Sequence, residues 1–170
     1  YAQDLVSFTE KIKLLIGLRW SWQEATVNTY DLTKTPTALT ITPARKDEAL
    51  SPKVGLVYQP TKDMSLFASY SNSFTPNTGT TVDLQPIEAS IIDQYEIGIK
   101  KDFMKGLITT NVTAYIIDNN NLAQTAPFAA DGVTPNVNTN LKELVGGTRG
   151  KGIEIDITAR PVEGLNLMAG

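Results

Sequence analysis

The sequence predicts an all-β protein, an antiparallel up-and-down meander of about eight strands. Three observations favour this fold class. Apolar and polar residues alternate with a period of two, the connections alternate between short turns and long polar loops, and aromatic residues stand at both ends of the apolar stripes. A period of two places successive side chains on opposite faces of a sheet, so most of the predicted strands have one apolar and one polar face.

The first predicted hairpin contains the clearest strand of the chain. A strand is expected over Tyr1–Phe8, although its two faces are not distinguished, and Thr9-Glu10 would form the turn. Over Lys11–Gln23, the even-numbered positions from Ile12 to Trp22 are apolar throughout, and the odd-numbered positions are polar or Gly except for Leu15. A helix, with 3.6 residues per turn, would mix the two sets. The run slightly exceeds the roughly 9–11 residues that a tilted membrane strand needs.

The middle of the chain repeats the predicted strand–turn–strand hairpin after a long polar connection over Asn28–Ala49. Strands are predicted over Lys53–Gln59 and Ser65–Ser73, with a turn at Pro60–Asp63 that is indicated by its composition. A second long loop is expected over Phe74–Ser90, because it holds Pro and Gly without periodicity.

The last part of the chain adds four predicted strands and the longest loop. The strands are expected over Ile91–Lys101, Leu107–Asp118, Gly152–Arg160 and Leu165–Ala169. Between the second and third of them, Asn119–Gly150 is predicted to be a loop rich in Asn, Thr, Gly and Pro. The connections therefore alternate between short and long along the whole chain.

The composition excludes several functions. The chain has 170 residues, a net charge of -3, and neither Cys nor His. Without these residues it can form no thiol nucleophile, disulfide, zinc site of the usual kind or Ser-His-Asp triad. The slight acidity and the lack of a Lys/Arg cluster argue against nucleic-acid binding. No apolar run approaches the roughly 20 residues of a membrane helix, but a strand-built barrel would escape that test because half of each strand is polar.

The pattern is typical of a bacterial outer-membrane barrel. Such barrels have short periplasmic turns, longer extracellular loops and two aromatic girdles. Their charged face lines a wet or plugged interior, and the sheet must close because every backbone group needs a partner in lipid. The expected girdle residues are Trp20, Trp22, Tyr70 and Tyr95 toward the long loops, and Tyr58 and Phe103 toward the turns.

Three stretches resemble the barrel of TonB-dependent outer-membrane receptors, most closely the ferric-siderophore type. They are SPKVGLVYQPTKDMSLFASYSNSFTPN from Ser51, QYEIGIK at Gln94–Lys100 and GIEIDI from Gly152. The resemblance implies a barrel of about 22 strands in the outer membrane, occluded by a plug domain, which takes up ferric siderophore with energy from TonB. Residues 1–170 would be part of that barrel, without the plug and without the TonB-contacting segment.

The resemblance also implies the chemistry. No catalysis and no cofactor are expected, because the siderophore carries the iron, and the partners would be the ferric siderophore, TonB acting through the plug, and outer-membrane lipid. In this family, aromatic residues above the plug often contact the siderophore. The corresponding candidates for ligand contact in the long loops or at the rim are Tyr30, Phe74 and Phe128, with ordinary loop packing as the alternative.

Charged residues on the polar strand faces are predicted to face the lumen or the plug. A cation on the lipid face costs about 2–4 kcal/mol at the bilayer midplane, which favours the inward orientation. Glu154 and Asp156 lie side by side and have the pairing that acid–base catalysis uses, but lining the lumen is the preferred interpretation. The full set is Arg19, Glu96, Lys100, Glu154, Asp156 and Arg160.

Gly146–Gly152, reading GGTRGKG, superficially resembles a phosphate-binding loop. It has the wrong glycine spacing and lacks Ser or Thr after the Lys, so a flexible entry into a strand is expected instead.

Two other architectures compete with the receptor barrel. One is a small closed barrel of about eight strands with a structural or adhesion role, and the other is a soluble sandwich or lipocalin-like binding module. Both ends of the sequence look cut, and the last run is too short to span and close a sheet, which argues against the small barrel. We therefore expect an open, curved sheet whose end strands lack partners.

Overall fold

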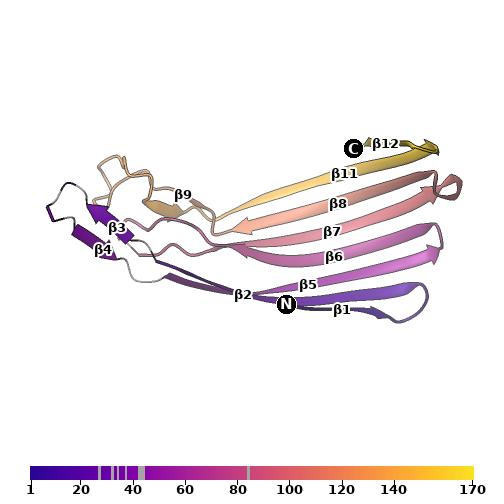
Figure 1. Ribbon diagram of the computed structural model, residues 1–170, viewed down its shortest axis with the longest axis horizontal. Coiled ribbons are helices and arrows are strands. Elements are labelled where there is room, and N and C mark those ends of the chain that lie inside the picture. Colours follow the sequence, from indigo (N-terminus) through magenta and orange to yellow (C-terminus); the bar gives the residue numbers. More distant parts are fainter. Residues whose placement is uncertain (27, 32, 34, 37, 42–44, 84) are drawn as a thin grey trace.

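The computed structural model describes residues 1–26, 28–31, 33, 35–36, 38–41, 45–83 and 85–170. Eight strands form one antiparallel sheet in the order β1-β2-β5-β6-β7-β8-β11-β12 (Figure 1). Each long strand pairs with the next long strand along the chain, which confirms the predicted up-and-down meander. Their bounds are β1 (Ala2–Ser7), β2 (Ile12–Ala25), β5 (Arg45–Thr61), β6 (Met64–Thr75), β7 (Ser90–Phe103), β8 (Ile108–Asn120), β11 (Gly147–Val162) and β12 (Leu165–Ala169).

Two small hairpins lie in segments that the sequence predicts to be loops. β3 (Asn28–Asp31) pairs with β4 (Ala38–Ile41) in the first long connection, and β9 (Ala123–Thr125) pairs with β10 (Lys142–Leu144) in the third. A single 3-10 turn, η1 (Met104–Gly106), joins β7 to β8. No helix among the described residues has the length and apolar character needed to cross a membrane.

The strands extend beyond the predicted boundaries at the loop end. β5 begins at Arg45 rather than Lys53, and its first residues pair with the end of β2 down to Ala25. β11 begins at Gly147, so the glycine-rich stretch expected to be a flexible entry is itself strand, paired with Asn120 and its neighbours on β8. The first residues of both extensions, 45–48 and 147–151, are polar or glycine on both faces. Backbone pairing with the neighbouring strand keeps these residues in the sheet, and no alternation of apolar and polar residues marks them as strand in the sequence.

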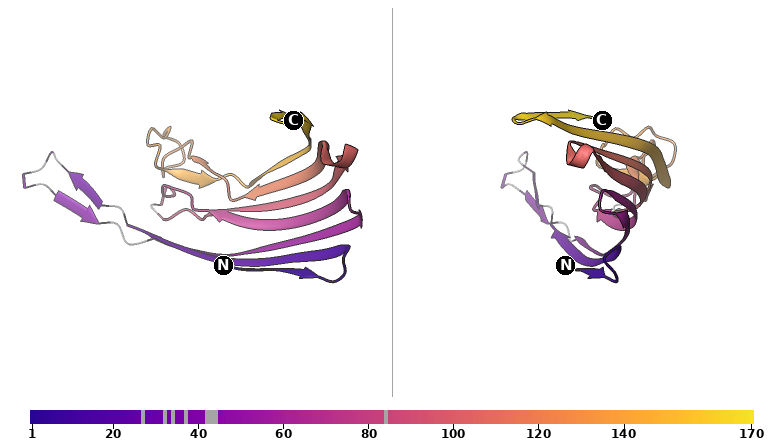
Figure 2. Two further views of the ribbon diagram at one scale, coloured as in Figure 1. Left: turned by 45° about the vertical axis from the view of Figure 1, so that its right-hand side comes forward. Right: turned by 90° about the vertical axis from the view of Figure 1, so that its right-hand side faces the viewer.

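The sheet is open and curved (Figure 2). In the described part of the chain, β1 pairs with β2 alone and β12 pairs with β11 alone, so the eight strands do not close on themselves. This confirms the expected open sheet and corrects the alternative of a small closed barrel.

Burial in this sheet is inverted relative to a soluble protein. On the outer face, large apolar residues such as Ile97 and Ile153 are 65% and 72% exposed. On the concave inner face, Ser51 and Thr113 are both only 8% exposed. Among the described residues, the buried hydrophobic side chains Ile87 and Ala126 lie in the long loops and not in the sheet. An exposed apolar belt of this extent requires an apolar surrounding such as lipid.

The apolar belt crosses the sheet at a slant. On β2 it runs from Ile12 to Trp22, and on β11 it runs from Ile153 to Ile157. The centre of the β11 stripe is Ile155. Following the residue pairs from strand to strand across the sheet leads from Ile155 to Ile12, which is the turn-side end of the β2 stripe. A shift of about five residues over about five strand spacings corresponds to a strand tilt of about 35°. This tilt is the one that transmembrane barrels have.

Two aromatic side chains on the inner face lie flat across glycines of the neighbouring strand. A Cβ atom at Gly98 would lie 2.3 Å from Cζ of Phe67, and one at Gly152 would lie 2.6 Å from Oη of Tyr115. The paired residues are directly opposite in register, Phe67 with Gly98 and Tyr115 with Gly152. Each ring covers the backbone that its glycine leaves bare, and such pairs help to fix the register of adjacent strands.

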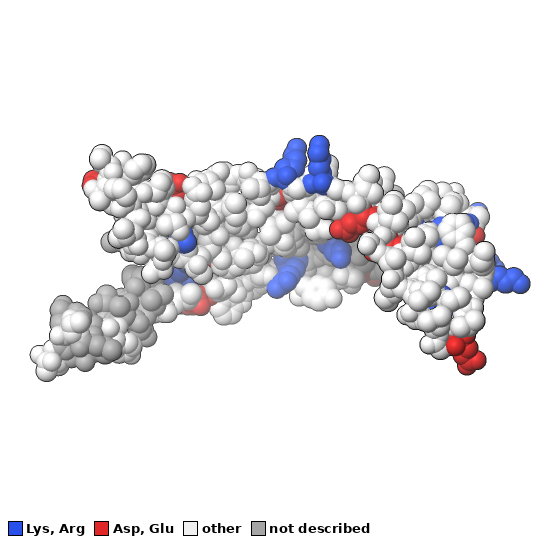
Figure 3. Space-filling view, turned by 90° about the horizontal axis from the view of Figure 1, so that it is seen from above, with Lys and Arg blue, Asp and Glu red and all other residues white. Residues whose placement is uncertain are grey.

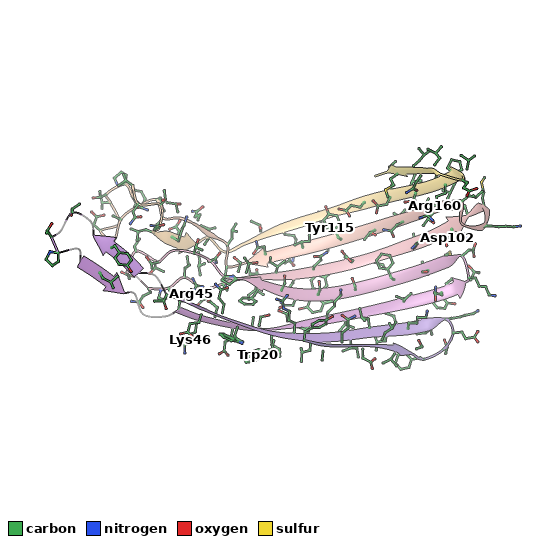
Figure 4. All side chains as sticks on the ribbon, viewed as in Figure 1. Trp20, Arg45, Lys46, Asp102, Tyr115 and Arg160 are labelled. Carbon is green, nitrogen blue, oxygen red and sulfur yellow. The ribbon has the colours of Figure 1, made fainter. Side chains whose placement is uncertain are left out.

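Polar pairs close the turn end of the sheet. The Lys101 ammonium group hydrogen-bonds the Asp63 carboxylate across the β6–β7 edge, and the Thr109 hydroxyl donates to Asp102 at 2.7 Å. Lys101 and then Thr61 lower the pKa of Asp63, which lies in the β5–β6 turn, to about 2. Asp102 and Arg160 are both found at this end of the molecule (Figure 4).

Candidate functional site

The inner face carries most of the charged residues predicted to face the lumen. Glu96 accepts hydrogen bonds from the Ser69 hydroxyl at 3.1 Å and from the Gln94 amide at 2.6 Å. Lys100 lies on the same face of β7 as Glu96, four residues further along the strand. On β2, Arg19 lies opposite the buried Ser51 of β5. The structure therefore places these residues on the polar face of the wall.

The remaining predicted charges lie on β11. Asp156 accepts a hydrogen bond from the Asn111 amide at 3.3 Å, and Glu154 lies opposite Thr113 on the same face. Arg160 lies near the turn end, where its backbone amide donates to the Leu107 carbonyl at 2.7 Å. The six charged candidates are thus spread along several strands and do not form one catalytic cluster.

A hollow on the inner face brings two cations together. It has a volume of about 340 Å³ and is lined by β1, β2, β5 and β6. Arg19 and Lys53 are the charged residues among its described lining, which otherwise consists mostly of Ser and other small or polar residues. Arg19 belongs to the predicted set, whereas Lys53 does not. The alternation of Lys53 with Gly55 is the signal that assigns it to the inner face.

The three aromatic candidates for ligand contact lie on separate elements. Tyr30 is exposed on β3. Phe74 stands near the end of β6, opposite Ile91, and borders the hollow described above. Phe128 is half-exposed in the third long loop, where it bridges to Pro135. No ring contact joins these three residues within the described part of the chain.

A hydrogen-bond network ties the bases of the long loops together. The Asn77 amide donates to the carbonyl oxygens of Glu88 at 2.6 Å and Asn121 at 3.0 Å. The Ser90 hydroxyl, which is buried, donates to the same Asn121 carbonyl at 2.9 Å, and the Arg45 guanidinium donates to the Asn77 carbonyl. Figure 4 places Arg45 at the junction between the strands and the loops. We call this group the loop-base network; no sequence periodicity marks it.

The second and third long loops are also joined further out. The Thr80 amide donates to the Asn140 carbonyl at 3.0 Å, and the Lys142 amide donates to the Thr80 carbonyl at 2.7 Å. Gly79 makes this approach possible, since a Cβ atom there would lie 2.4 Å from the Asn140 oxygen. Ile87, 1% exposed, is the most deeply buried side chain among the described loop residues. The two loops therefore pack as one unit above the sheet.

The third loop also has an internally fixed turn. The carboxylate of Asp131 accepts hydrogen bonds from the Val133 and Thr134 amides at 3.0 and 2.9 Å and from the Thr134 hydroxyl at 2.5 Å. The Thr134 hydroxyl and then these amides lower the pKa of Asp131. The turn presents Val133 and Val137 with highly exposed side chains.

A polar row marks the loop-side border of the apolar belt on the outer face. The rings of Tyr70 and Tyr95 lie 5.1 Å apart, and the Tyr70 hydroxyl donates to Asp93 at 2.7 Å. One row beyond, Arg149 donates to Asp118 through two nitrogens at 2.5 and 2.9 Å. This arrangement, with rings in the belt and hydroxyl groups toward charges, is that of an interfacial aromatic girdle.

The described residues give no sign of a metal centre or of a nucleic-acid surface. No group of three or more Asp, Glu, His or Cys side chains among them is placed to hold a metal ion. Seen from above, acidic and basic side chains are interspersed over a mostly uncharged surface, and some basic side chains reach into the recessed middle on the concave side (Figure 3).

Comparison with known proteins assigns the chain to a family. The family model described as "TonB dependent receptor-like, beta-barrel" matches residues 1–170. The ferric-pyoverdine 358 receptor of Pseudomonas putida is 26% identical over 71% of this chain and 14% of its own length. The metal-pseudopaline receptor CntO of Pseudomonas aeruginosa is 26% identical over 98% of this chain and 22% of its own length. The chain thus spans about a fifth or less of these relatives.

Solved structures have the same fold. The pyoverdine outer membrane receptor FpvA of Pseudomonas aeruginosa superposes with a TM-score of 0.71 at 20% identity, covering 96% of this chain and 22% of that chain. The alcaligin outer membrane receptor FauA of Bordetella pertussis gives a TM-score of 0.66 at 20% identity, covering 95% and 27%. The exposed apolar belt, the girdle and the open wall agree with the family match, and we conclude that the chain belongs to the β-barrel family of TonB-dependent receptors, which are outer-membrane proteins of Gram-negative bacteria.

Proposed function

We propose that residues 1–170 are part of the barrel wall of a receptor that takes up a ferric siderophore, with energy transmitted by TonB. The observation that carries this proposal is the family match over the whole chain, which coincides with a wall that is apolar outside and polar inside. Several relatives are named as receptors for ferric or metal chelates. A polar inner face suits the passage of such a hydrophilic complex.

The parts of the transport cycle divide between this wall and the rest of the protein. We assign the plug domain and the TonB-contacting segment to the remainder of the receptor. The siderophore holds the iron, so the wall needs neither a metal site nor a catalytic group. The long loops and the aromatic side chains of Tyr30, Phe74 and Phe128 are the proposed outer contacts for the ligand, because loops on a rigid scaffold commonly carry function.

The test is iron uptake by the full-length receptor in a Gram-negative host that lacks its own siderophore receptors. Cells are given iron-55 as ferric pyoverdines and as ferric alcaligin under iron limitation. We expect uptake of at least one complex and its loss when TonB is deleted from the host. Uptake that persists without TonB, or no uptake from any ferric siderophore, would contradict the proposal.

A second candidate is uptake of another metal chelate. The metal-pseudopaline receptor CntO matches almost the whole chain, more of it than the ferric-pyoverdine 358 receptor does. The same cells, given pseudopaline loaded with different first-row transition metals, distinguish the two candidates. Accumulation of a metal from pseudopaline, with none of iron from ferric siderophores, would favour this second function.

A further inference from the structure

The inner-wall hollow brings together two exposed cations, Arg19 and Lys53, with no acidic residue among its described lining. Arg19 lies opposite Ser51, and Lys53 lies opposite Gly17, so the two cations are diagonal neighbours across β2 and β5. Diagonal neighbours have their Cβ atoms about 7–8 Å apart. Neither side chain has a hydrogen bond or an ion pair in the described part of the chain, although both stand on the concave face. Two like charges so placed repel each other.

The surroundings of the pair fit a negatively charged group. No Asp or Glu is found among the described residues that line the hollow. Hydroxyl groups of Ser21, Ser51, Ser71 and Ser73 border it, and the absence of a side chain at Gly17 leaves space between the cations. Carboxylate and other anionic oxygens accept strong hydrogen bonds from guanidinium and ammonium groups. An oxygen anion between them would replace the repulsion by two attractions.

We propose that Arg19 and Lys53 form an anion-binding site on the inner wall that takes a carboxylate or a comparable oxygen anion. The inference rests on the proposed function, because it requires that this face line a lumen. The anion has two sources, a negatively charged group of the imported complex or a carboxylate of the plug domain, and both have the same chemistry. The three predicted acidic residues of the inner face, Glu96, Glu154 and Asp156, lie outside the lining of this hollow.

The test compares three forms of the full-length receptor purified in detergent. They are the wild type, the double variant R19Q/K53Q and the control K13Q, which removes an inner-face cation of β2 that does not line the hollow. Citrate is the probe, and its binding is measured by calorimetry together with the midpoint of thermal unfolding. If the site is open to solutes, wild type and K13Q bind citrate equally, and the double variant binds at least 10-fold more weakly.

If a plug carboxylate fills the site, citrate binds to none of the three forms and the double variant unfolds at a lower temperature than K13Q. The direction of the change in unfolding temperature distinguishes a filled site from an empty one, because removing two repelling charges from an empty site would raise the unfolding temperature. Equal citrate binding by all three forms overturns the proposal, as does an absence of binding with an unchanged or raised unfolding temperature. These readouts need no iron, so failed uptake with intact citrate binding would refute the transport function alone.

Discussion

At the scale of single residues, the two ring-covered glycines are the most sensitive positions of the wall. We expect Gly98→Ala and Gly152→Ala to destabilise the full-length barrel by about 1–3 kcal/mol, because a methyl group would overlap the Phe67 or Tyr115 ring. Gly98→Ala should be the worse of the two, since its Cβ would also lie 2.8 Å from the Val112 carbonyl oxygen.

Gly150→Ala is the matched control for this prediction. It lies on β11, two residues from Gly152, and a Cβ atom there meets no neighbour within 4 Å. Unfolding in urea, followed by Trp fluorescence, measures the three variants. A Gly150→Ala barrel as unstable as Gly152→Ala would show that backbone freedom, and not the ring contact, explains the glycine.

The assignment of strand faces is also tested by neighbouring residues. Leu18 lies near the middle of the outer stripe of β2, and Arg19 faces inward. Leu18→Arg should impair membrane assembly, at a cost of about 2–4 kcal/mol, whereas Arg19→Leu should be milder. The heat-modifiable gel mobility of the full-length receptor in outer-membrane fractions reports assembly. Equal effects of the two changes would show that the faces are assigned wrongly.

The sequence predicts well which face of the wall a strand residue lies on, because successive residues of a strand alternate between the two faces. Arg19, Glu96, Lys100, Glu154 and Asp156 lie on the polar face as the period of two requires. The residues of the loop-base network give no such signal, because their roles arise from hydrogen bonds between segments far apart in the chain. Asn77 and Asn121, for example, are joined only in the folded molecule.

At the scale of elements, the β5–β6 turn is tied to β7 by a pH-sensitive contact. The Lys101 ammonium group lowers the pKa of Asp63 to about 2, below its unfolded value of about 3.9. The carboxylate therefore stabilises the folded state fully above about pH 4, and this contribution is lost as the pH falls through about 2. Since Asp63→Asn removes the charge, its destabilising effect in urea unfolding should shrink between pH 4 and pH 2.

A difference between wild type and Asp63→Asn that stays constant over that range would contradict the assigned ion pair. Glu163→Gln is a control at the same end of the molecule, since Glu163 lies in the β11–β12 turn and has no hydrogen bond or ion pair among the described residues. Its effect should not depend on pH in this way.

The loop-base network should hold the second and third long loops without stabilising the sheet. Asn77→Ala removes the side-chain bonds to the carbonyl groups of Glu88 and Asn121. We expect faster amide hydrogen exchange in both loops and an unchanged urea midpoint of the barrel, because local openings have their own free energy. Exposed Thr78, with no hydrogen bond in the described chain, is the control when changed to Ala.

The ends of the strands are predicted less well from the sequence than their lipid-facing parts. The apolar stripe of β5 begins near Leu50, but the strand starts at Arg45 because its backbone continues to pair with β2. The same holds for the first residues of β11, which pair with β8 in spite of their glycines. Hydrophobic periodicity reports the part of a strand that meets lipid, and backbone pairing decides the rest.

At the scale of the whole molecule, residues 1–170 expressed alone should not give a stable particle. β1 and β12 each have one edge without a strand partner in the described chain, and open edges of long strands template aggregation. We expect aggregates in detergent by size-exclusion chromatography, in contrast to the full-length receptor. A monodisperse, heat-modifiable particle would instead favour an independent small barrel.

The slanted belt has a consequence for the surrounding bilayer. With the estimated tilt, the outer apolar stripe of β2 is about 27 Å tall along the membrane normal, close to the usual 25 Å of such barrels. The stripe of β11 from Ile153 to Ile157 reaches only about 11 Å by the same measure. Hydrophobic mismatch thins the lipid next to a short apolar surface. The receptor should therefore sit in a bilayer of uneven thickness, with its thinnest lipid annulus beside β11.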